Sequence, residues 1–319
     1  MIITRTPLRI SFVGGGSDCP WFYEQQLGAV VSATINKYIY ISVNDSFDNK
    51  YRLHYSKFEE VTKAGDIKNE LIKTILDYHE IKPLEISSMA DLPSKTGLGS
   101  SSSYAVGLIR ALYPTMVKEN IANRACQIEI EQMKKPVGKQ DQYAATFGGL
   151  NYIRFIGENV DIEPIELPPE LEQNLILFYT GKSRKAETIH QDITEHITEE
   201  KIEITKQLAK LAVILKNRIK IADSRAFPSI LHEGWMLKKR MSKLVSDDQI
   251  DGWYDSAISA GALGGKLLGA GGGGFLLFYV PREYQENVKR MLPLQQIDFK
   301  FENKGTEIIY EDRNHSWRI

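Results

Sequence analysis

The 319-residue sequence lacks the features that mark several large classes of protein. Its two cysteines, Cys19 and Cys126, make no disulfide framework and suit a reducing compartment. Charged side chains nearly balance, to a net charge of -1, so there is no electrostatic footprint for nucleic acid or a membrane surface. No apolar run approaches the roughly 18 residues of a membrane span, and no signal-peptide pattern opens the sequence. We therefore expect a cytoplasmic globular protein with a small ligand.

Three familiar site motifs are also absent. A P-loop requires G-x-x-x-x-G-K-[ST], but the Gly-Lys pair at 265–266 is followed by Leu267. A dinucleotide fingerprint G-x-G-x-x-G that starts at Gly14 fails at its last position, which is Cys19. The six histidines contain no H-E-x-x-H pair. The sequence thus supports neither common nucleotide-binding fold and no histidine-based zinc site.

The apolar pattern predicts an α+β protein. Extended segments are expected at "IITRTPLRISFV", "AVVSATINKYIYISVN", "PLEISSMA", "GGLNYIRFI" and "NLILFYTG". Helical spacing is expected at 66–80, 104–112, 186–219 with an interruption at Glu200, 225–245, 252–266 and 282–291, with further strands at 274–280, near 296–301 and at 306–310. Composition shifts after about residue 180. We therefore predict a mixed α/β N-terminal domain over 1–175 and a helix-rich C-terminal domain over 176–319.

The stretch 97–103 is the first candidate site. Glycines let backbone N–H groups converge, and the first turn of a following helix adds unpaired donors, so such a loop suits phosphate. The residues predicted to bind phosphate are Gly97, Leu98, Gly99, Ser100, Ser101 and Ser102. A plain turn with a serine N-cap is the alternative that this stretch alone leaves open.

A second glycine-rich stretch, "KLLGAGGGGFLLFYV", runs into an apolar strand. Consecutive glycines are entropically costly, so we interpret them as backbone that must approach a ligand or the other glycine loop closely. Gly271, Gly272 and Gly273 are predicted to form this structural turn. A simple tight turn is the alternative.

Two acidic residues are candidates for chemistry. When residues 121–133 are placed on a helical wheel at about 100° per residue, Glu129 lies in the middle of the apolar face, while Glu131 lies on the opposite side. A carboxylate on an apolar face requires a cation, so we predict either a buried salt bridge or a Mg²⁺ site shared with a serine hydroxyl such as that of Ser101. Asp141 begins a helical segment after a Pro-x-Gly turn, where a capping role is the simple alternative.

In order along the chain, "TPLRISFVGGGSD", "PSKTGLGSSSS" and "LLGAGGGGF" resemble the three motifs of the galacto-, homoserine, mevalonate and phosphomevalonate (GHMP) kinases. The resemblance covers nearly the whole chain. It implies a two-domain α+β fold, with a mixed α/β N-terminal domain like ribosomal protein S5 and a helix-rich, ferredoxin-like C-terminal domain. It also implies a sugar kinase, a phosphotransferase with an alcohol group as acceptor, that uses ATP and Mg²⁺.

The same resemblance assigns roles to individual residues. Asp141 falls at the position of the catalytic base, and Arg9 at the basic residue beside the base and the transferred phosphoryl group. Glu129 falls at the Mg²⁺ carboxylate, which the wheel selects independently. Ser100 and Ser101 match loop serines, one of which helps to hold Mg²⁺.

The substrate is suggested by differences within the family. Galactokinase and mevalonate kinase have Glu-His where this chain has Gly15 and Gly16, which argues against galactose and mevalonate. The chain is most similar to D-glycero-D-manno-heptose 7-phosphate kinases, which make the 1,7-bisphosphate on the way to GDP-heptose. Fucokinase-type enzymes have a similar Gly-Gly-x-Ser/Thr-Asp motif after the first strand and are the alternative sugar 1-kinases. A catalytically silent sugar sensor and a decarboxylase on the same fold are alternatives of other classes.

Two groups of residues are predicted to contact the sugar phosphate. Gly16, Ser17 and Asp18 follow the first strand. Lys182 and Arg184, with Lys185, stand where a helix begins, and cations there are mismatched with the helix dipole unless an anion such as a 7-phosphate binds. A solvated basic turn is the alternative. Nothing indicates nucleic acid or a membrane as a partner, and no pattern predicts an oligomeric state.

Overall fold

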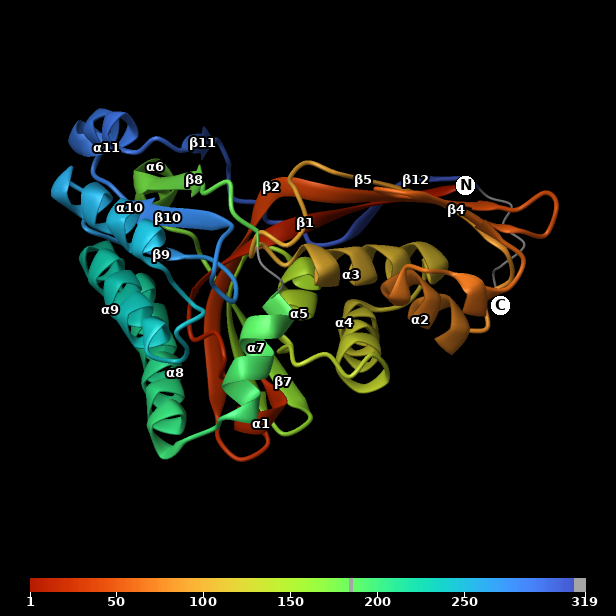
Figure 1. Ribbon diagram of the computed structural model, residues 1–319, viewed down its shortest axis with the longest axis horizontal. Helices are drawn as coiled ribbons and strands as arrows, with labels where there is room; N and C mark the ends of the chain where they lie inside the picture. Colours follow the sequence, from red (N-terminus) through yellow and green to blue (C-terminus); the bar gives the residue numbers. More distant parts are fainter. Residues whose placement is uncertain (184–185, 313–319) are drawn as a thin grey trace.

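Two long strands form the frame of the first sheet. We describe the protein from a computed structural model, over residues 1–183 and 186–312. β1 (Ile2–Val13) and β2 (Gly28–Asp45) pair antiparallel along most of their length (Figure 1). Both are largely buried, and β1 buries Thr4, Thr6, Arg9 and Ser11 together with its apolar residues. The remaining strands of this sheet are β3 (Tyr51–His54), β4 (Phe58–Val61), β5 (Leu84–Ala90), β6 (Leu150–Ile156), β7 (Asn159–Ile165) and β12 (Glu307–Glu311).

The length of β2 lets it serve two partners. Its second half pairs with β5 and its first half with β6, to which β7 is added as a hairpin. The path through the sheet is β12-β1-β2-β5-β3-β4, and β3 runs parallel to β5 while the other pairs are antiparallel. The helices before β8 are α1 (Pro20–Tyr23), α2 (Glu70–Tyr78), α3 (Ser100–Leu112), α4 (Lys118–Cys126), α5 (Gln140–Phe147) and α6 (Pro169–Asn174). Of these, α3 packs on β1 and β2, and α2, α4 and α5 lie around it (Figure 1).

A second, smaller sheet follows in the chain. Its strands are β8 (Leu175–Tyr179), β9 (Gly264–Leu267), β10 (Phe275–Tyr279) and β11 (Gln295–Ile297), in the order β11-β8-β10-β9 and all antiparallel. Five helices lie in this part of the chain: α7 (Ala186–Glu195), α8 (Glu199–Lys220), α9 (Phe227–Lys239), α10 (Asp248–Ser259) and α11 (Gln285–Met291). Of these, α9 and α10 contact β9 of the second sheet, whereas α8 packs mainly on β2 of the first. No helix in the two described ranges is long and apolar enough to cross a membrane.

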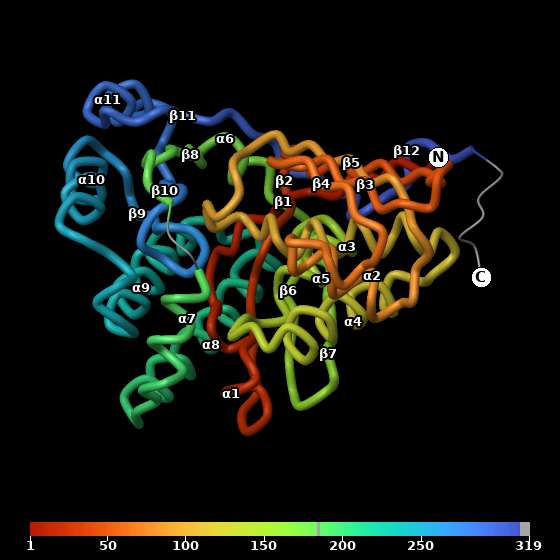
Figure 2. Tube along the Cα trace, turned by 45° about the vertical axis from the view of Figure 1, so that its right-hand side comes forward, coloured from red at the N-terminus to blue at the C-terminus, as the bar shows by residue number. Residues whose placement is uncertain are grey.

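The last strand returns to the first sheet. β12 pairs antiparallel with β1, so segments about 300 residues apart lie side by side, as Figure 2 shows at the N-terminal end of the chain. Before it, Phe301 makes a single bridge to Ile35 of β2. The end of the chain therefore ties the helix-rich part back to the N-terminal sheet, and the proposed division at 175–176 remains a prediction.

The structure shortens one predicted helix. The pattern over 252–266 continues as a helix in the sequence, but α10 ends at Ser259 and Gly264–Leu267 is the strand β9. β9 pairs antiparallel with β10, and a Cβ on Gly265 would lie 2.4 Å from the Phe278 ring on that strand. The strand exists because it packs closely on β10, which the local sequence does not reveal. The stripe at 186–219 forms two helices, α7 and α8, but the break between them lies at 196–198 rather than at Glu200, which is in the first turn of α8.

Candidate active site

A cavity of about 810 Å³ lies where the two parts of the chain meet. Its walls come from β1 and the loop after it, the phosphate-loop stretch 97–103, the loop before α5, helices α7 and α9, and the second glycine stretch. The size is that expected for a small-molecule site. Residues from both halves of the sequence are therefore needed to form it.

The phosphate-loop stretch has the geometry that its sequence predicts. Gly97 and Gly99 have φ angles of +84° and +75°, which favour glycine, and Gly99 is the left-handed N-cap of α3. Helix α3 begins at Ser100, within the serine run, so backbone donors at its first turn face the cavity. Leu98 is buried beneath the loop and does not line the cavity.

The two glycine stretches touch each other through backbone. A Cβ on Gly269 would lie 2.2 Å from Gly97 Cα, and one on Gly274 would lie 2.2 Å from the Thr96 carbonyl oxygen. The close approach to the other glycine loop, one of the two expectations for this stretch, is therefore present. Gly271 packs instead on Val245.

Replacing Gly269 by Ala is expected to destabilise the protein. Its φ of +72° costs an L-residue roughly 1–3 kcal/mol, and the new methyl would overlap the backbone of Gly97. Urea denaturation followed by circular dichroism measures the change in free energy of unfolding. Gly252→Ala is the matched control, because Gly252 lies within α10 with open space around it and should be neutral or slightly stabilising. Equal stability of Gly269→Ala and the wild type would contradict this account of the contact.

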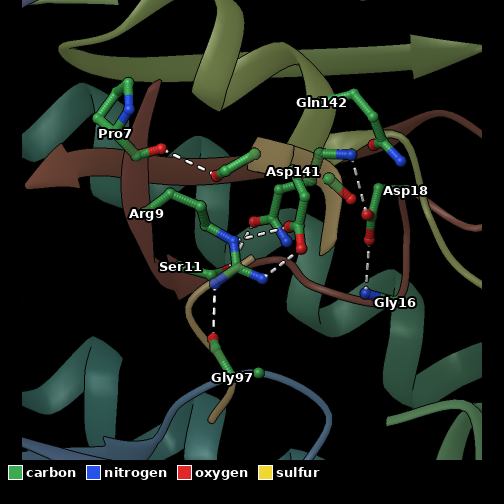
Figure 3. Close-up of polar contacts among 12 residues, drawn as sticks. Pro7, Arg9, Ser11, Gly16, Asp18, Gly97, Asp141 and Gln142 are labelled. Carbon is green, nitrogen blue, oxygen red and sulfur yellow. Dashed lines mark hydrogen bonds and ion pairs between the residues drawn. The ribbon is translucent and has the colours of Figure 1, made fainter. Parts of the chain in front are cut away.

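Arg9 joins the phosphate loop to Asp141. Its Nε and Nη2 each donate to one carboxylate oxygen of Asp141 at 2.7 Å, and its Nη1 donates to the Gly97 carbonyl at 2.6 Å (Figure 3). Arg9 is 4% exposed, whereas the Asp141 side chain is 24% exposed and lines the cavity. This bidentate pair fixes the orientation of the carboxylate, which retains lone pairs that can accept from a ligand.

Asp18 lies beside this pair. It is buried and accepts from the backbone N–H of Gly16 at 2.8 Å and of Gln140 at 3.2 Å (Figure 3). Burial raises the pKa of the Asp18 carboxyl, and the nearby charge of Asp141 raises it further. Gly16 and Asp18 both line the cavity, whereas the Ser17 hydroxyl is buried and bonds to backbone.

Glu129 meets the serines at the start of α3. It is 1% exposed, and its two oxygens accept from Ser101 Oγ at 2.7 Å and Ser102 Oγ at 2.6 Å. Gln142 Nε2 also donates to it, at 2.8 Å. The segment that carries Glu129, Gln127–Gln132, is π-helical and follows α4 directly, and such bulges are frequent at functional sites. The structure thus brings together the acid and the serine that the sequence paired.

A cation already fits between these oxygens. Lys135 Nζ lies 3.3 Å from Glu129 Oε1 and 3.2 Å from Ser101 Oγ. Within the described ranges no group of three or more His, Cys, Asp or Glu side chains could hold a metal by itself. Magnesium usually binds through one or two carboxylates together with substrate phosphates and water, so a single acid with a hydroxyl beside the phosphate loop fits it.

The basic turn before α7 is only partly described. Arg184 and Lys185 lie outside the described residues. Lys182 Nζ pairs with Asp247 at 2.7 Å and lies over the Trp253 ring, and Lys182 is not among the described residues that line the cavity. Its part in binding a 7-phosphate remains a prediction.

His190, Lys238 and Lys266 are among the cavity-lining residues that the sequence analysis did not single out. Burial lowers the pKa of His190 on α7 to about 4, so it is neutral near pH 7. Lys266 on β9 is buried and donates to two β1 carbonyls, at 2.7 and 2.8 Å. Lys238 lies on α9 one turn after Gly234 and on the face of the buried Leu231. The wheel argument that selects Glu129 applies equally to this cation.

Comparison with known proteins places the chain in a family. The models of the GHMP kinases N terminal domain and GHMP kinases C terminal match residues 66–149 and 223–296. A D-glycero-alpha-D-manno-heptose 7-phosphate kinase from Campylobacter jejuni is 33% identical, with 100% of this chain and 99% of that protein aligned. A bifunctional fucokinase/GDP-fucose pyrophosphorylase from Arabidopsis thaliana is 26% identical over 85% of this chain, which spans 29% of that protein.

Solved structures agree with these matches. The structure of a D-glycero-D-manno-heptose 1-phosphate kinase from Bacteroides thetaiotaomicron superposes with a TM-score of 0.78 at 25% identity, covering 98% of this chain and 100% of that one. The predicted α+β, two-domain fold is confirmed. Members of this family use ATP as the phosphate donor. The chain therefore belongs to the GHMP kinases and is a sugar kinase.

Proposed function

We propose that the protein transfers the γ-phosphoryl group of ATP to the anomeric hydroxyl of D-glycero-D-manno-heptose 7-phosphate. The product is the 1,7-bisphosphate, which would serve GDP-heptose synthesis for surface polysaccharide. The observation that carries the reaction class is the bidentate pair of Arg9 and Asp141, held against the phosphate loop through the Gly97 carbonyl. The choice of sugar is supported by the full-length similarity to the Campylobacter jejuni kinase.

The donor phosphates are assigned to the loop at 97–103. Backbone N–H groups at the start of α3 and the left-handed glycines before it form a site for an anion. Glu129 and Ser101 would hold Mg²⁺ at the edge of this site, with the Lys135 ammonium giving way. Bound Mg²⁺ supplies charge neutralisation at the β- and γ-phosphate oxygens.

The acceptor is assigned to the part of the cavity beside Asp141. Asp141 accepts the proton of the anomeric hydroxyl as that oxygen forms its bond to the γ-phosphorus and the bond from phosphorus to the ADP oxygen breaks. Arg9 offsets the negative charge on the carboxylate and on the phosphoryl oxygens. Asp18, fixed by two backbone donors, is placed to accept hydrogen bonds from sugar hydroxyls.

The direct test is ADP release by the purified protein with Mg²⁺ and ATP. We expect turnover with D-glycero-D-manno-heptose 7-phosphate and little with fucose, because a 7-phosphate adds charge that a bare sugar lacks. Phosphorus NMR of the product should show a new anomeric phosphate beside the original one.

Other outcomes would redirect the proposal. Preferential turnover of fucose would keep the phosphoryl-transfer assignment but make the substrate a bare sugar, as the name of the Arabidopsis thaliana fucokinase implies for that relative. Binding of sugar and ATP without any turnover would favour a sensor. No turnover with any sugar would contradict the proposed reaction.

A further inference from the structure

Among the described residues, five lysine and arginine side chains line the cavity, and four of them have a polar partner or are exposed to solvent. They are Arg9, Lys95, Lys135, Lys238 and Lys266. Arg9 pairs with Asp141, and Lys135 pairs with Glu129. Lys266 donates to two backbone carbonyls, and Lys95 is exposed. Lys238 is the remaining one of the five, and no carboxylate pairs with it among the described residues.

The Lys238 ammonium is held inside the cavity with few partners. It donates to the Gly269 carbonyl oxygen, and the described part of the chain offers it no carboxylate partner. Lys238 is partly buried, and an ammonium partly removed from water with no carboxylate in hydrogen-bond reach is stabilised by an anion beside it. Burial, and next the charge of Arg9, lowers the pKa of Lys238 to about 8. The groups that face it electrostatically are Arg9, Asp18, Cys19, Asp141, His190 and Lys266.

The Lys238 ammonium lies next to the phosphate loop. Its acceptor, Gly269, packs directly on Gly97 of the phosphate loop, whose carbonyl also accepts from Arg9. Lys238 and Arg9 therefore approach the same point of the loop, one from α9 and the other from β1. Two cations at that point suit a ligand that carries several negative oxygens.

We propose that Lys238 is a phosphate-binding residue of this site, contributed by the C-terminal half of the chain. The phosphate has two sources under the proposed function, on which this inference rests: the 7-phosphate of the acceptor, or the phosphoryl group in transfer. Both present the same anionic oxygens. A charge-assisted hydrogen bond from the ammonium replaces water that the partly buried side chain has lost.

The test compares Lys238→Met and Lys238→Arg with Lys239→Met as the matched control. Lys239 is the next residue of α9, but it pairs with Asp251 and does not line the cavity within the described ranges. Calorimetry measures Kd for D-glycero-D-manno-heptose 7-phosphate without nucleotide, and ADP release measures kcat. We expect Lys238→Met to lose about 10- to 100-fold in one of these quantities. A loss in Kd assigns the acceptor phosphate, and a loss in kcat alone assigns the transferred group.

The pH profile separates binding from a structural role. In the wild type, the affected quantity should worsen about tenfold from about pH 7 to about pH 9, because an ammonium with a pKa near 8 becomes neutral over that range. Phosphate itself stays a dianion across most of it. Lys238→Arg should remove this dependence and retain the affinity, while Lys238→Met should remove both. Unchanged Kd and kcat in Lys238→Met would overturn the inference.

Failure of the proposed substrate is detected separately. Kd for inorganic phosphate is measured with the same variants, since it carries the recognised group without the sugar. Weaker phosphate binding in Lys238→Met, in a protein that does not turn over heptose 7-phosphate, would keep the assignment of Lys238 and remove the substrate. Equal Kd values for phosphate, heptose 7-phosphate and the nucleotide in all variants, with equal kcat, would remove the assignment of Lys238.

Discussion

Asp141→Asn should retain ATP binding and lose about 10²- to 10⁴-fold in kcat, the usual contribution of a positioned base. The amide cannot accept the proton of the sugar hydroxyl. It can also accept only one of the two hydrogen bonds that Arg9 donates at 2.7 Å, so the guanidinium loses its counter-charge. Steady-state ADP release gives kcat, and calorimetry with ADP gives the nucleotide affinity.

A control variant away from the cavity tests whether loss of a carboxylate charge anywhere on the protein lowers kcat. Asp161→Asn removes an exposed acid that pairs with Arg154 on the β6–β7 hairpin, away from the cavity lining. It should leave kcat unchanged, because an exposed pair contributes little. If Asp141→Asn kept wild-type turnover, Asp141 would be a helix-terminal carboxylate and the base would have to be sought elsewhere, with Asp18 as the next acid in the cavity.

The parts of the site that local sequence could predict are those with a local physical signal. Glu129 is detectable because a carboxylate on an apolar helical face violates the amphipathic pattern, and the structure finds it 1% exposed between two serines. The loop at 97–103 is detectable because glycines and serines precede a helix. Its helix nevertheless begins at Ser100 rather than at 104, since the serines themselves form the first turn.

What the sequence could not supply is partners across long separations. β12 pairs with β1, and Lys266 donates to carbonyls of the same strand some 250 residues earlier. Periodicity identifies which face of an element is apolar but carries no information on which element covers it. Lys238 shows the difference. Its position on the apolar face of a helix can be predicted from the sequence, but its contact with Gly269 depends on how the second glycine stretch packs.

The contact between the two glycine stretches brings Arg9 and Lys238, from distant parts of the sequence, to the phosphate loop. Gly97 touches Gly269, Arg9 donates to Gly97, and Lys238 donates to Gly269. The phosphate loop is thus held between a strand from the first sheet and a helix that accompanies the second. Groups positioned by packing in this way are preorganised, which is how charge stabilisation acts in enzymes.

Glu129→Gln is expected to lower kcat/KM by about 10²- to 10³-fold at fixed Mg²⁺, with part of the loss recovered as Mg²⁺ is raised. The amide keeps the shape of Glu129 but removes the charge that Lys135 and a metal ion would share. It also has one acceptor oxygen in place of two, so the hydroxyls of Ser101 and Ser102 cannot both donate to it as they do now. The dependence of ADP release on Mg²⁺ concentration is the informative measurement, because a purely structural defect would not respond to the metal.

Glu131→Gln is the matched control for this prediction. Glu131 lies two residues further along the same π-helical segment and is exposed, so its neutralisation should leave both activity and Mg²⁺ dependence unchanged. Thermal unfolding of both variants measures how much of any loss comes from the fold, since a buried carboxylate with four hydrogen-bond donors around it also stabilises the protein. A Glu129→Gln protein with reduced stability and a wild-type Mg²⁺ profile would make Glu129 the buried salt-bridge partner of Lys135. In that case the metal would have to be held by the nucleotide and the serines without this carboxylate.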